Sequence, residues 1–246
     1  MSIAQILESA AARVAMLERD EKAQGVSIVI PCYNQSAFLR TALDAAVNQT
    51  LPALEIIVVD DGSSEDVASV VAEYPSVRYL RVANRGLPGA RNAGLMNARG
   101  HAFLPLDADD WIEPTFLEKT LPLLEDVVCV GLEEFGERHG TYMPGCELGL
   151  EKLTLEAERK SNRLFYCSLF RTALLKEVGG YNGRMIHGYE DWDLWVDLMQ
   201  RGAKLAAVNE VLFHYNTRSD SMLQETERKW RNWCLDEMAR HHGYRR

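Results

Sequence analysis

Short apolar segments alternate with segments of helical periodicity from residue 26 onward, and this alternation constrains the fold more than any other feature. The strand-like segments cover 26–30, 54–59, 77–82 and 102–106, and the helix-like segments between them cover 36–47, 65–73 and 88–98. Strands that alternate with helices of about ten residues indicate βαβ units and a mainly parallel sheet. The expected fold class is therefore α/β, with a doubly wound sheet.

The second half of the chain is less regular. The elements expected there are a helix that ends near Leu124, a strand over 127–132, a polar, glycine-rich stretch to Leu150, an interrupted helix over 151–180, a helix over 189–201 and one or two strands over 204–215. No stretch is long enough to act as a linker between two independent domains. We therefore expect the second half to complete the active site of the first.

Composition indicates a soluble protein that does not bind nucleic acid. The 246 residues suit one α/β domain, with or without a small appendage. Apolar residues make up 47% and charged residues 26%, as in ordinary globular proteins. The formal net charge of −9 argues against a nucleic-acid partner, because proteins that bind nucleic acids present a basic face.

The cysteines and the hydropathy indicate a cytoplasmic protein. The five cysteines are scattered and form no C-x-x-C pair, which favours reduced thiols over a disulfide framework or a zinc site. No apolar run approaches the roughly 20 residues of a membrane-spanning helix, and the N-terminus lacks the core of a signal peptide. We expect no transmembrane segment, and at most peripheral contact with the inner face of the membrane.

Three carboxylates follow the fourth strand-like segment. Asp107, Asp109 and Asp110 stand within four positions, with Ala108 between the first two. Carboxylates this close raise one another's pKa unless a cation or solvent offsets their charge. In open α/β sheets, ligands bind beyond the carboxyl ends of the strands, and oxygen ligands there suit a hydrated Mg²⁺ or Mn²⁺ shared with phosphate. The alternative, an acidic turn that caps a helix with Pro114 at its first position, stays open from these residues alone.

Two other strand-like segments also end in polar turns. The first ends in PCYN at 31–34, where the ring of Tyr33 could stack on a base and Asn34 could cap the next helix. The second ends in DDGS at 60–63, where an aspartate could accept a hydrogen bond from a ribose hydroxyl or a base N–H. Plain capped turns explain either tetrapeptide equally well.

Two helix starts carry the remaining polar signals. Arg91 falls near the start of the helix expected over 88–98, where phosphate could bind, although the nearby glycines match neither a P-loop nor a dinucleotide fingerprint. Glu190 and Asp191 follow a glycine and lie between aromatic residues at the start of the helix expected over 189–201. Favourable interaction with the helix dipole explains one of these acids. The pair is therefore a candidate for a general base in an apolar wall.

Together these stretches resemble the family 2 glycosyltransferases of the GT-A fold. The shared pattern, in order, is P-x-Y-N, V-V-D-D-G-S, R-G-x-x-x-A-R-N-x-G, D-A-D-D and G-x-E-D, and it covers roughly residues 26–222. The resemblance implies a GT-A fold, a nucleotide-sugar donor, a divalent metal ion (Mn²⁺ or Mg²⁺) and transfer with inversion at the anomeric carbon. A UDP-sugar is the first guess for the donor.

The resemblance also implies roles for individual residues. It assigns donor binding to Pro31, Tyr33, Asn34, Asp61, Arg91, Asp107, Ala108, Asp109 and Arg218, metal binding to Asp109 and Asp107, catalysis to Asp191, and the acceptor side to Glu190 and Trp192. Asp109 would be the more direct metal ligand, and Asp191 would deprotonate the acceptor hydroxyl. Asp193 is expected to face solvent or to cap its helix, because neighbouring helix residues point about 100° apart.

The sequence departs from the family pattern near its end. Residues 215–218 resemble a segment that often reads Y-R-x-H, but Asn216 replaces the arginine and Arg218 replaces the histidine. Arg218 could contact phosphate, but an arginine is not a metal ligand.

The extent of the resemblance predicts the organisation of the chain. We expect the GT-A domain to cover 25–222. Outside the resemblance, helical spacing of apolar residues predicts an amphipathic helix over 1–24 and a C-terminal helix with a basic tail over 223–246. Within the domain, the nucleotide-binding half covers about 25–112 and the acceptor-binding half about 113–222. We expect the first helix to form a homodimer contact rather than to bind a membrane, and the role of the C-terminal helix stays open.

The activity implied is transfer of a sugar to a hydroxyl of a saccharide or lipid-linked acceptor, in polysaccharide or glycoconjugate biosynthesis. Two alternatives remain: a catalytically silent protein that binds sugar nucleotides, and a nucleotidyltransferase. All the acidic residues of the family pattern are present, which argues against a catalytically silent protein. The second lacks a Lys/Arg-rich glycine loop after the first strand.

Overall fold

The computed structural model describes residues 25–145 and 149–244. The helix expected over 1–24, with its proposed dimer contact, lies outside the described residues. The described strands form one nine-stranded sheet in the order β3-β2-β1-β4-β8-β6-β9-β5, with β7 beside β6. Within the described ranges, no helix combines the length and the apolar character needed to cross a bilayer.

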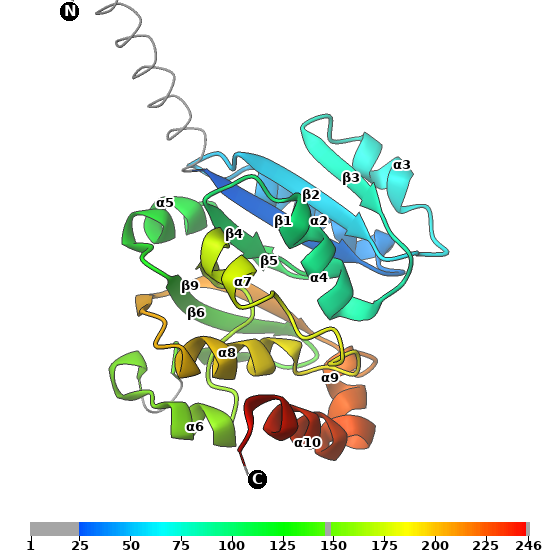
Figure 1. The fold of residues 1–246 in the computed structure, drawn as a ribbon. Helices are drawn as coiled ribbons and strands as arrows, with labels where there is room; N and C mark the ends of the chain where they lie inside the picture. Colours follow the sequence, from blue (N-terminus) through cyan, green and yellow to red (C-terminus); the bar gives the residue numbers. More distant parts are fainter. Residues whose placement is uncertain (1–24, 146–148, 245–246) are drawn as a thin grey trace, which may run out of the picture.

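The first half of the sheet is parallel (Figure 1). Its strands are β1 (Val26–Cys32), β2 (Glu55–Asp60), β3 (Val77–Arg81) and β4 (Ala102–Pro105), and its helices are α2 (Ser36–Val47), α3 (Val67–Ala72) and α4 (Gly86–Asn97). The register places Ser27 of β1 opposite Glu55 of β2 and opposite Phe103 of β4. This arrangement confirms the predicted α/β fold with a doubly wound, mainly parallel sheet.

The second half of the sheet is mixed. Its strands are β5 (Trp111–Ile112), β6 (Val127–Gly136), β7 (Gly140–Tyr142), β8 (Leu169–Arg171) and β9 (Leu205–Thr217), and its helices are α5 (Phe116–Thr120), α6 (Leu155–Lys160), α7 (Thr172–Glu177) and α8 (Glu190–Gln200), with 3₁₀ turns at Leu121–Leu123 and Leu150–Lys152. β6 and β9 pair in parallel, whereas β5, β7 and β8 pair antiparallel with their neighbours.

Apolar side chains on the two faces of the sheet form separate cores. Ile28 and Ile30 of β1 join the core beneath α2, α3 and α5, and Val29 joins the core beneath α4, α7 and α8. Alternate residues of a strand point to opposite faces, so a strand covered on both faces must be apolar throughout. This double coverage explains the continuous apolar runs of the sequence.

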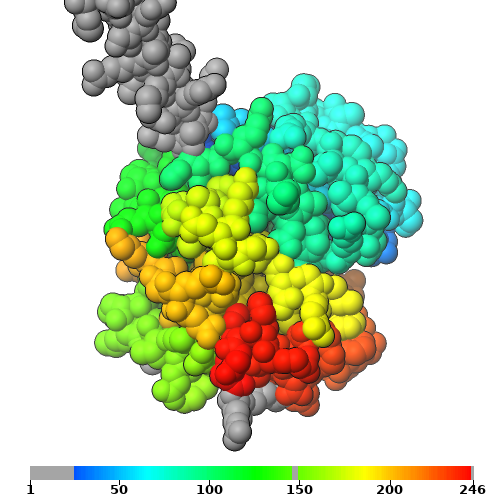
Figure 2. All heavy atoms as spheres, in the orientation of Figure 1, coloured from blue at the N-terminus to red at the C-terminus, as the bar shows by residue number. Residues whose placement is uncertain are grey.

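The C-terminal segment packs on the domain. It consists of α9 (Met222–Glu225), a π-helical turn (Thr226–Trp230) and α10 (Arg231–His242). Trp192 and Val196 of α8 share a buried apolar cluster with Cys234 and Met238 of α10. Figure 2 shows this segment, in red, directly against the yellow and orange surface of the region that contains α8. The C-terminal helix is therefore covered by the domain along one side.

Two short strands differ from the sequence-based expectation. Residues 169–171 were expected within an interrupted helix but form β8, in which Phe170 pairs with Phe103 and with Val127. β5 directly follows the acidic turn, which was expected to lead straight into a helix, and α5 begins at Phe116 rather than at Pro114. In both strands the pairing partners are distant in sequence, so tertiary contacts override the local pattern.

A close approach between α4 and β1 gives a stability prediction. A Cβ at Gly94 would lie 2.2 Å from Cγ1 of Val29. Alanine favours a helix over glycine by about 1 kcal/mol, but an extra methyl group in a packed core costs about 1–3 kcal/mol. We expect Gly94→Ala to lower the free energy of unfolding by up to about 2 kcal/mol in urea titrations. Gly183→Ala is the control, because no atom lies within 4 Å of its added Cβ; equal effects would contradict the close approach.

Candidate active site

A pocket of about 870 Å³ lies beyond the carboxyl ends of β1, β2 and β4. Most of the predicted site residues line it, namely Pro31, Tyr33, Asp61, Arg91, Asp107, Asp109, Glu190, Asp191, Trp192 and Arg218. Two predicted donor-binding residues lie outside the lining. Asn34 accepts hydrogen bonds from the backbone N–H and the hydroxyl of Ser64, and Ala108 is fully buried. The rule that ligands bind at strand ends therefore locates the pocket correctly.

The ends of β1 and β2 supply one polar wall of the pocket. Tyr33 keeps 50% of its surface exposed, which leaves its ring free to stack. Asp61 is buried and accepts a hydrogen bond from the backbone N–H of Arg85 at 2.9 Å. Burial raises the pKa of Asp61. These two residues give the wall an aromatic face and a fixed acceptor, which suits a planar heterocycle with N–H groups.

The acidic cluster after β4 divides between the pocket and the interior. Asp107 accepts two hydrogen bonds from Nη2 of Arg91, at 2.8 and 3.0 Å, and Asp109 pairs with Nη1 of Arg218 at 3.0 Å. Burial and the nearby charge of Asp107 raise the pKa of Asp109 to about 6, although Arg218 opposes the shift. Both carboxylates line the pocket. The charge of Asp109 is therefore incompletely balanced.

Asp110, the third acid of the cluster, has a structural role. It is fully buried and accepts hydrogen bonds from the backbone N–H of Asn216 at 2.7 Å and from the hydroxyl of Tyr166 at 2.5 Å. Burial raises its pKa well above the usual range. The same Tyr166 hydroxyl accepts a hydrogen bond from the backbone N–H of Asp107. Asp110 thus fixes the shape of the acidic turn from behind.

The oxygens of Asp107 and Asp109 suit a hard divalent cation. The donor set is carboxylate only, as Mg²⁺ and Mn²⁺ prefer, and both side chains open on a pocket large enough for a phosphate-bearing ligand. The raised pKa of Asp109 also favours a bound cation here, because a positive charge nearby would stabilise the ionised carboxylate and lower that pKa. The residues present therefore fit such an ion.

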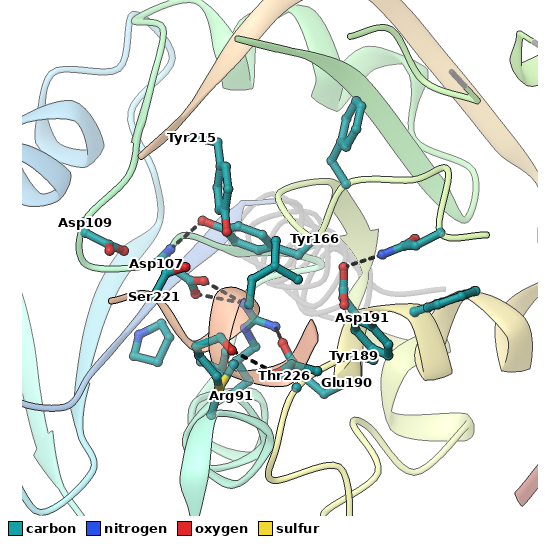
Figure 3. Close-up of a pocket in the computed structure, with 18 of the residues that line it drawn as sticks. Arg91, Asp107, Asp109, Tyr166, Tyr189, Glu190, Asp191, Tyr215, Ser221 and Thr226 are labelled. Atoms are coloured by element: carbon teal, nitrogen blue, oxygen red, sulfur yellow. Dashed lines mark hydrogen bonds and ion pairs between the residues drawn. The ribbon is translucent and has the colours of Figure 1, made fainter. Parts of the chain in front are cut away.

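Arg91 joins the acidic turn to the start of α8. Its Nη1 lies 2.6 Å from Oε1 of Glu190, while Nη2 binds Asp107, and the side chain is 1% exposed. Its guanidinium lies 4.6 Å from the centre of the Tyr166 ring and 5.3 Å from that of Tyr181. From the sequence, Arg91 was expected to contact phosphate. In the structure, carboxylates bind both terminal nitrogens of its guanidinium (Figure 3).

Asp191 faces the pocket from the first turn of α8, and none of the residues that the structure describes forms an ion pair with it. Its Oδ2 accepts a hydrogen bond from the Asn162 amide at 3.0 Å, and the residue is partly exposed. Glu190, beside it, is buried against Arg91. Burial raises the pKa of both carboxyls, and Arg91 opposes the shift. A carboxylate that is oriented by one amide and made more basic by its surroundings is suited to accept a proton.

The backbone before α8 is held in an unusual conformation. Tyr189 has φ of 61°, a left-handed value that is uncommon for a non-glycine residue. A Cβ at Gly188, where φ is 116°, would lie 2.4 Å from the hydroxyl oxygen of Thr226. Strained backbone of this kind persists where the surroundings fix it, often at functional sites. Here the contact with Thr226 and the turn at Tyr189 set the direction from which α8 presents its first two acids.

Asp193 corrects a prediction. The sequence placed it in solvent or at a helix cap, but its side chain is 2% exposed and pairs with His241 at 2.9 Å and with His242 at 3.0 Å. The physical reason is that α10 covers the outer side of α8, which a lone amphipathic helix would leave in water. The direction of Asp193, away from the pocket, agrees with the helical geometry used to separate it from Asp191.

Sequence reasoning missed several pocket residues. Tyr166 and Asn162 lie in a segment without a motif. The C-terminal segment adds residues from Ser221 to Arg231, most of them beyond residue 222, where the predicted domain ends. Glu227 accepts a hydrogen bond from the hydroxyl of Tyr189, which ties this segment to the start of α8. No local pattern marks these residues, because each reaches the pocket through contacts between distant parts of the chain.

Comparison with known proteins relates the chain to a family of glycosyltransferases. The sequence model of the family described as "Glycosyl transferase family 2" matches residues 27–179. The glycosyltransferase GlyA of Streptococcus pneumoniae is 27% identical over 237 residues, covering 87% of this chain and 34% of GlyA. The uncharacterised glycosyltransferase YwdF of Bacillus subtilis is 30% identical over 235 residues, covering 89% of this chain and 84% of YwdF.

Solved structures show the same fold. The structure of Staphylococcus aureus TarS residues 1–349 in complex with UDP-GlcNAc superposes with a TM-score of 0.69 at 20% identity, covering 82% of this chain and 61% of that one. The chain therefore has the GT-A fold of these structures. The chain belongs to glycosyl transferase family 2. It spans about a third of the length of GlyA and of the putative glycosyltransferase EpsH of Bacillus subtilis.

Proposed function

We propose that this chain transfers a sugar from a nucleotide sugar to an acceptor hydroxyl in the described pocket, with inversion at the anomeric carbon. One observation carries the proposal: the carboxylates of Asp107, Asp109 and Asp191 open on a single pocket. The first two suit a metal–diphosphate group, and the third suits a proton acceptor. Family membership supports the same reaction class.

The residues act as follows in this proposal. Asp191 accepts the proton of the acceptor hydroxyl, and the hydroxyl oxygen forms a bond to the anomeric carbon while the bond from that carbon to the diphosphate oxygen breaks. The nucleoside diphosphate leaves with the bonding electron pair. The amide of Asn162 occupies Oδ2 of Asp191, which leaves Oδ1 for the hydroxyl. A divalent ion held by Asp107 and Asp109 would offset the charge of the leaving diphosphate.

UDP-sugars are the first donors that we propose to test, because TarS has been solved with UDP and with UDP-GlcNAc. Tyr33 and Asp61 are proposed to bind the base. For the acceptor we propose a saccharide or a lipid-linked compound. The cysteines that the structure describes are free and buried, which supports the proposal of a reducing, cytoplasmic compartment.

A panel of nucleotide sugars with Mn²⁺ tests the donor. At about 100 times its Kd, a donor adds roughly 2.7 kcal/mol to the free energy of unfolding, so we expect its melting temperature to rise by roughly 5–10 °C. Nucleoside monophosphates serve as controls with a smaller expected shift. A panel without any response would contradict donor binding. Binding without turnover would favour the catalytically silent alternative, and release of diphosphate from a nucleoside triphosphate and a sugar phosphate would favour a nucleotidyltransferase.

A further inference from the structure

Three side chains outside the pocket converge between α8 and the end of α10. Nδ1 of His241 lies 2.9 Å from Oδ2 and 3.2 Å from Oδ1 of Asp193, and Nε2 of His242 lies 3.0 Å from Oδ1. These ligand-type atoms all lie within 4.8 Å of one another. The carboxylate and His242 are 2% exposed, and His241 is 44% exposed. None of the three lines the pocket.

The donor set matches zinc in type, and its nitrogen–oxygen separations are close to those of a zinc site. Zinc binds histidine nitrogen and carboxylate oxygen at about 2.0–2.2 Å, so two ligand atoms of a tetrahedral site lie about 3.3 Å apart. The observed separations between nitrogen and oxygen atoms are a few tenths of an ångström shorter, so a small outward movement of the rings would admit the ion. Imidazole favours zinc over Mg²⁺, which prefers oxygen ligands alone.

We propose that Asp193, His241 and His242 form a Zn²⁺ site that fastens the C-terminal helix to the helix carrying Asp191. The exposed side of His241 leaves the fourth position open to water. A bound ion would hold α10 on α8, and with it the preceding residues 221–231, which form part of the pocket wall. The site is separate from the carboxylate site at Asp109 and does not depend on the proposed reaction.

Two features of the site define the competing explanation. Histidines near the end of a helix interact favourably with its dipole when protonated, so the contacts could be ion pairs and hydrogen bonds alone. The amide Nδ2 of Asn182 also lies 3.2 Å from Nδ1 of His241, and a metal ion would displace it from that nitrogen. The two explanations differ in a measurable way, because only one of them takes up zinc.

The test is Zn²⁺ binding to the full-length, tag-free protein in excess Mg²⁺, which occupies all-oxygen sites. We expect the wild type to retain one zinc ion per chain after dialysis, by elemental analysis, and to gain thermal stability. His241→Ala and His242→Ala are each expected to weaken zinc binding at least about 100-fold by calorimetry. Since His241 is partly exposed, its replacement should leave the fold intact.

Two matched variants complete the design. His139→Ala removes an exposed histidine elsewhere and should retain zinc, and Asp109→Ala removes a pocket carboxylate and should also retain it. Co²⁺ in place of zinc gives a second readout, because its visible absorption reports nitrogen ligation in a site of low coordination number. A wild type that takes up no zinc, or histidine variants that bind zinc like the wild type, would overturn the proposal and leave an ion pair only.

Discussion

The Asp191→Asn variant is expected to bind donor normally and to turn over about 10²–10⁴ times more slowly than the wild type. Asparagine keeps the shape of the side chain and its hydrogen bond with Asn162, but it cannot accept a proton. The loss should therefore appear in kcat, while the donor Kd from calorimetry stays nearly unchanged. Both quantities should be measured with one pair of substrates at saturating metal.

Two variants of the same helix separate a base from a general charge effect. Glu190→Gln is expected to cost less than Asp191→Asn, chiefly in acceptor KM, because Glu190 is buried against Arg91. Asp197→Asn, which alters a carboxylate that pairs with Arg201, should behave like the wild type. Near wild-type turnover by Asp191→Asn together with an inactive Glu190→Gln would reassign the base to Glu190.

Loss of Asp109 should remove metal-dependent donor binding. We expect Asp109→Ala to weaken the affinity for a nucleoside diphosphate in Mn²⁺ by at least about 100-fold, and EDTA to weaken the wild type to a similar degree. Calorimetry measures both effects. The matched control is Asp220→Asn, because Asp220 is the other carboxylate paired with Arg218. Equal affinities with and without EDTA would remove the metal from the proposal.

The raised pKa of Asp109 adds a pH dependence to this prediction. The carboxyl titrates at about 6 in the free protein, so it is ionised above that pH and protonated below it. A cation must displace the proton at low pH, and affinity should fall by up to about tenfold per unit as the pH decreases from about 6. The Asp109→Asn variant has no titrating carboxyl at this position, so its remaining affinity for the metal should not show this dependence on pH. A wild-type affinity that is flat across this range would contradict the assignment.

Local patterns account for much of the fold and for the location of the pocket. The helix expected over 36–47 has the bounds of α2, because its apolar residues repeat at helical spacing and its inner face is buried. The acids at the ends of β2 and β4 could be placed because strand ends carry ligands in open α/β sheets. The sequence did not show which of these acids would face the pocket. Asp110 is turned inward because it binds Tyr166, which is distant in sequence.

The remaining features depend on contacts that no local pattern encodes. β8 is only three residues long and exists because β4 and β6 lie on either side of it. Asp193 is buried because α10 covers it, and the role of the C-terminal segment stayed open for the same reason. Sequence periodicity describes the inner face of a helix, but it does not show which distant segment covers the outer face.

The buried position of Arg91 makes the two ends of the pocket energetically interdependent. One guanidinium balances both Asp107 and Glu190, and water reaches only 1% of it. Removal of one partner of a buried ion pair leaves charge without compensation, so a change at either carboxylate alters the electrostatic potential at the other. Substitutions at the two positions should therefore be non-additive. We therefore expect changes in the acidic turn and at the start of α8 to occur together in related sequences, although the two segments lie far apart along the chain.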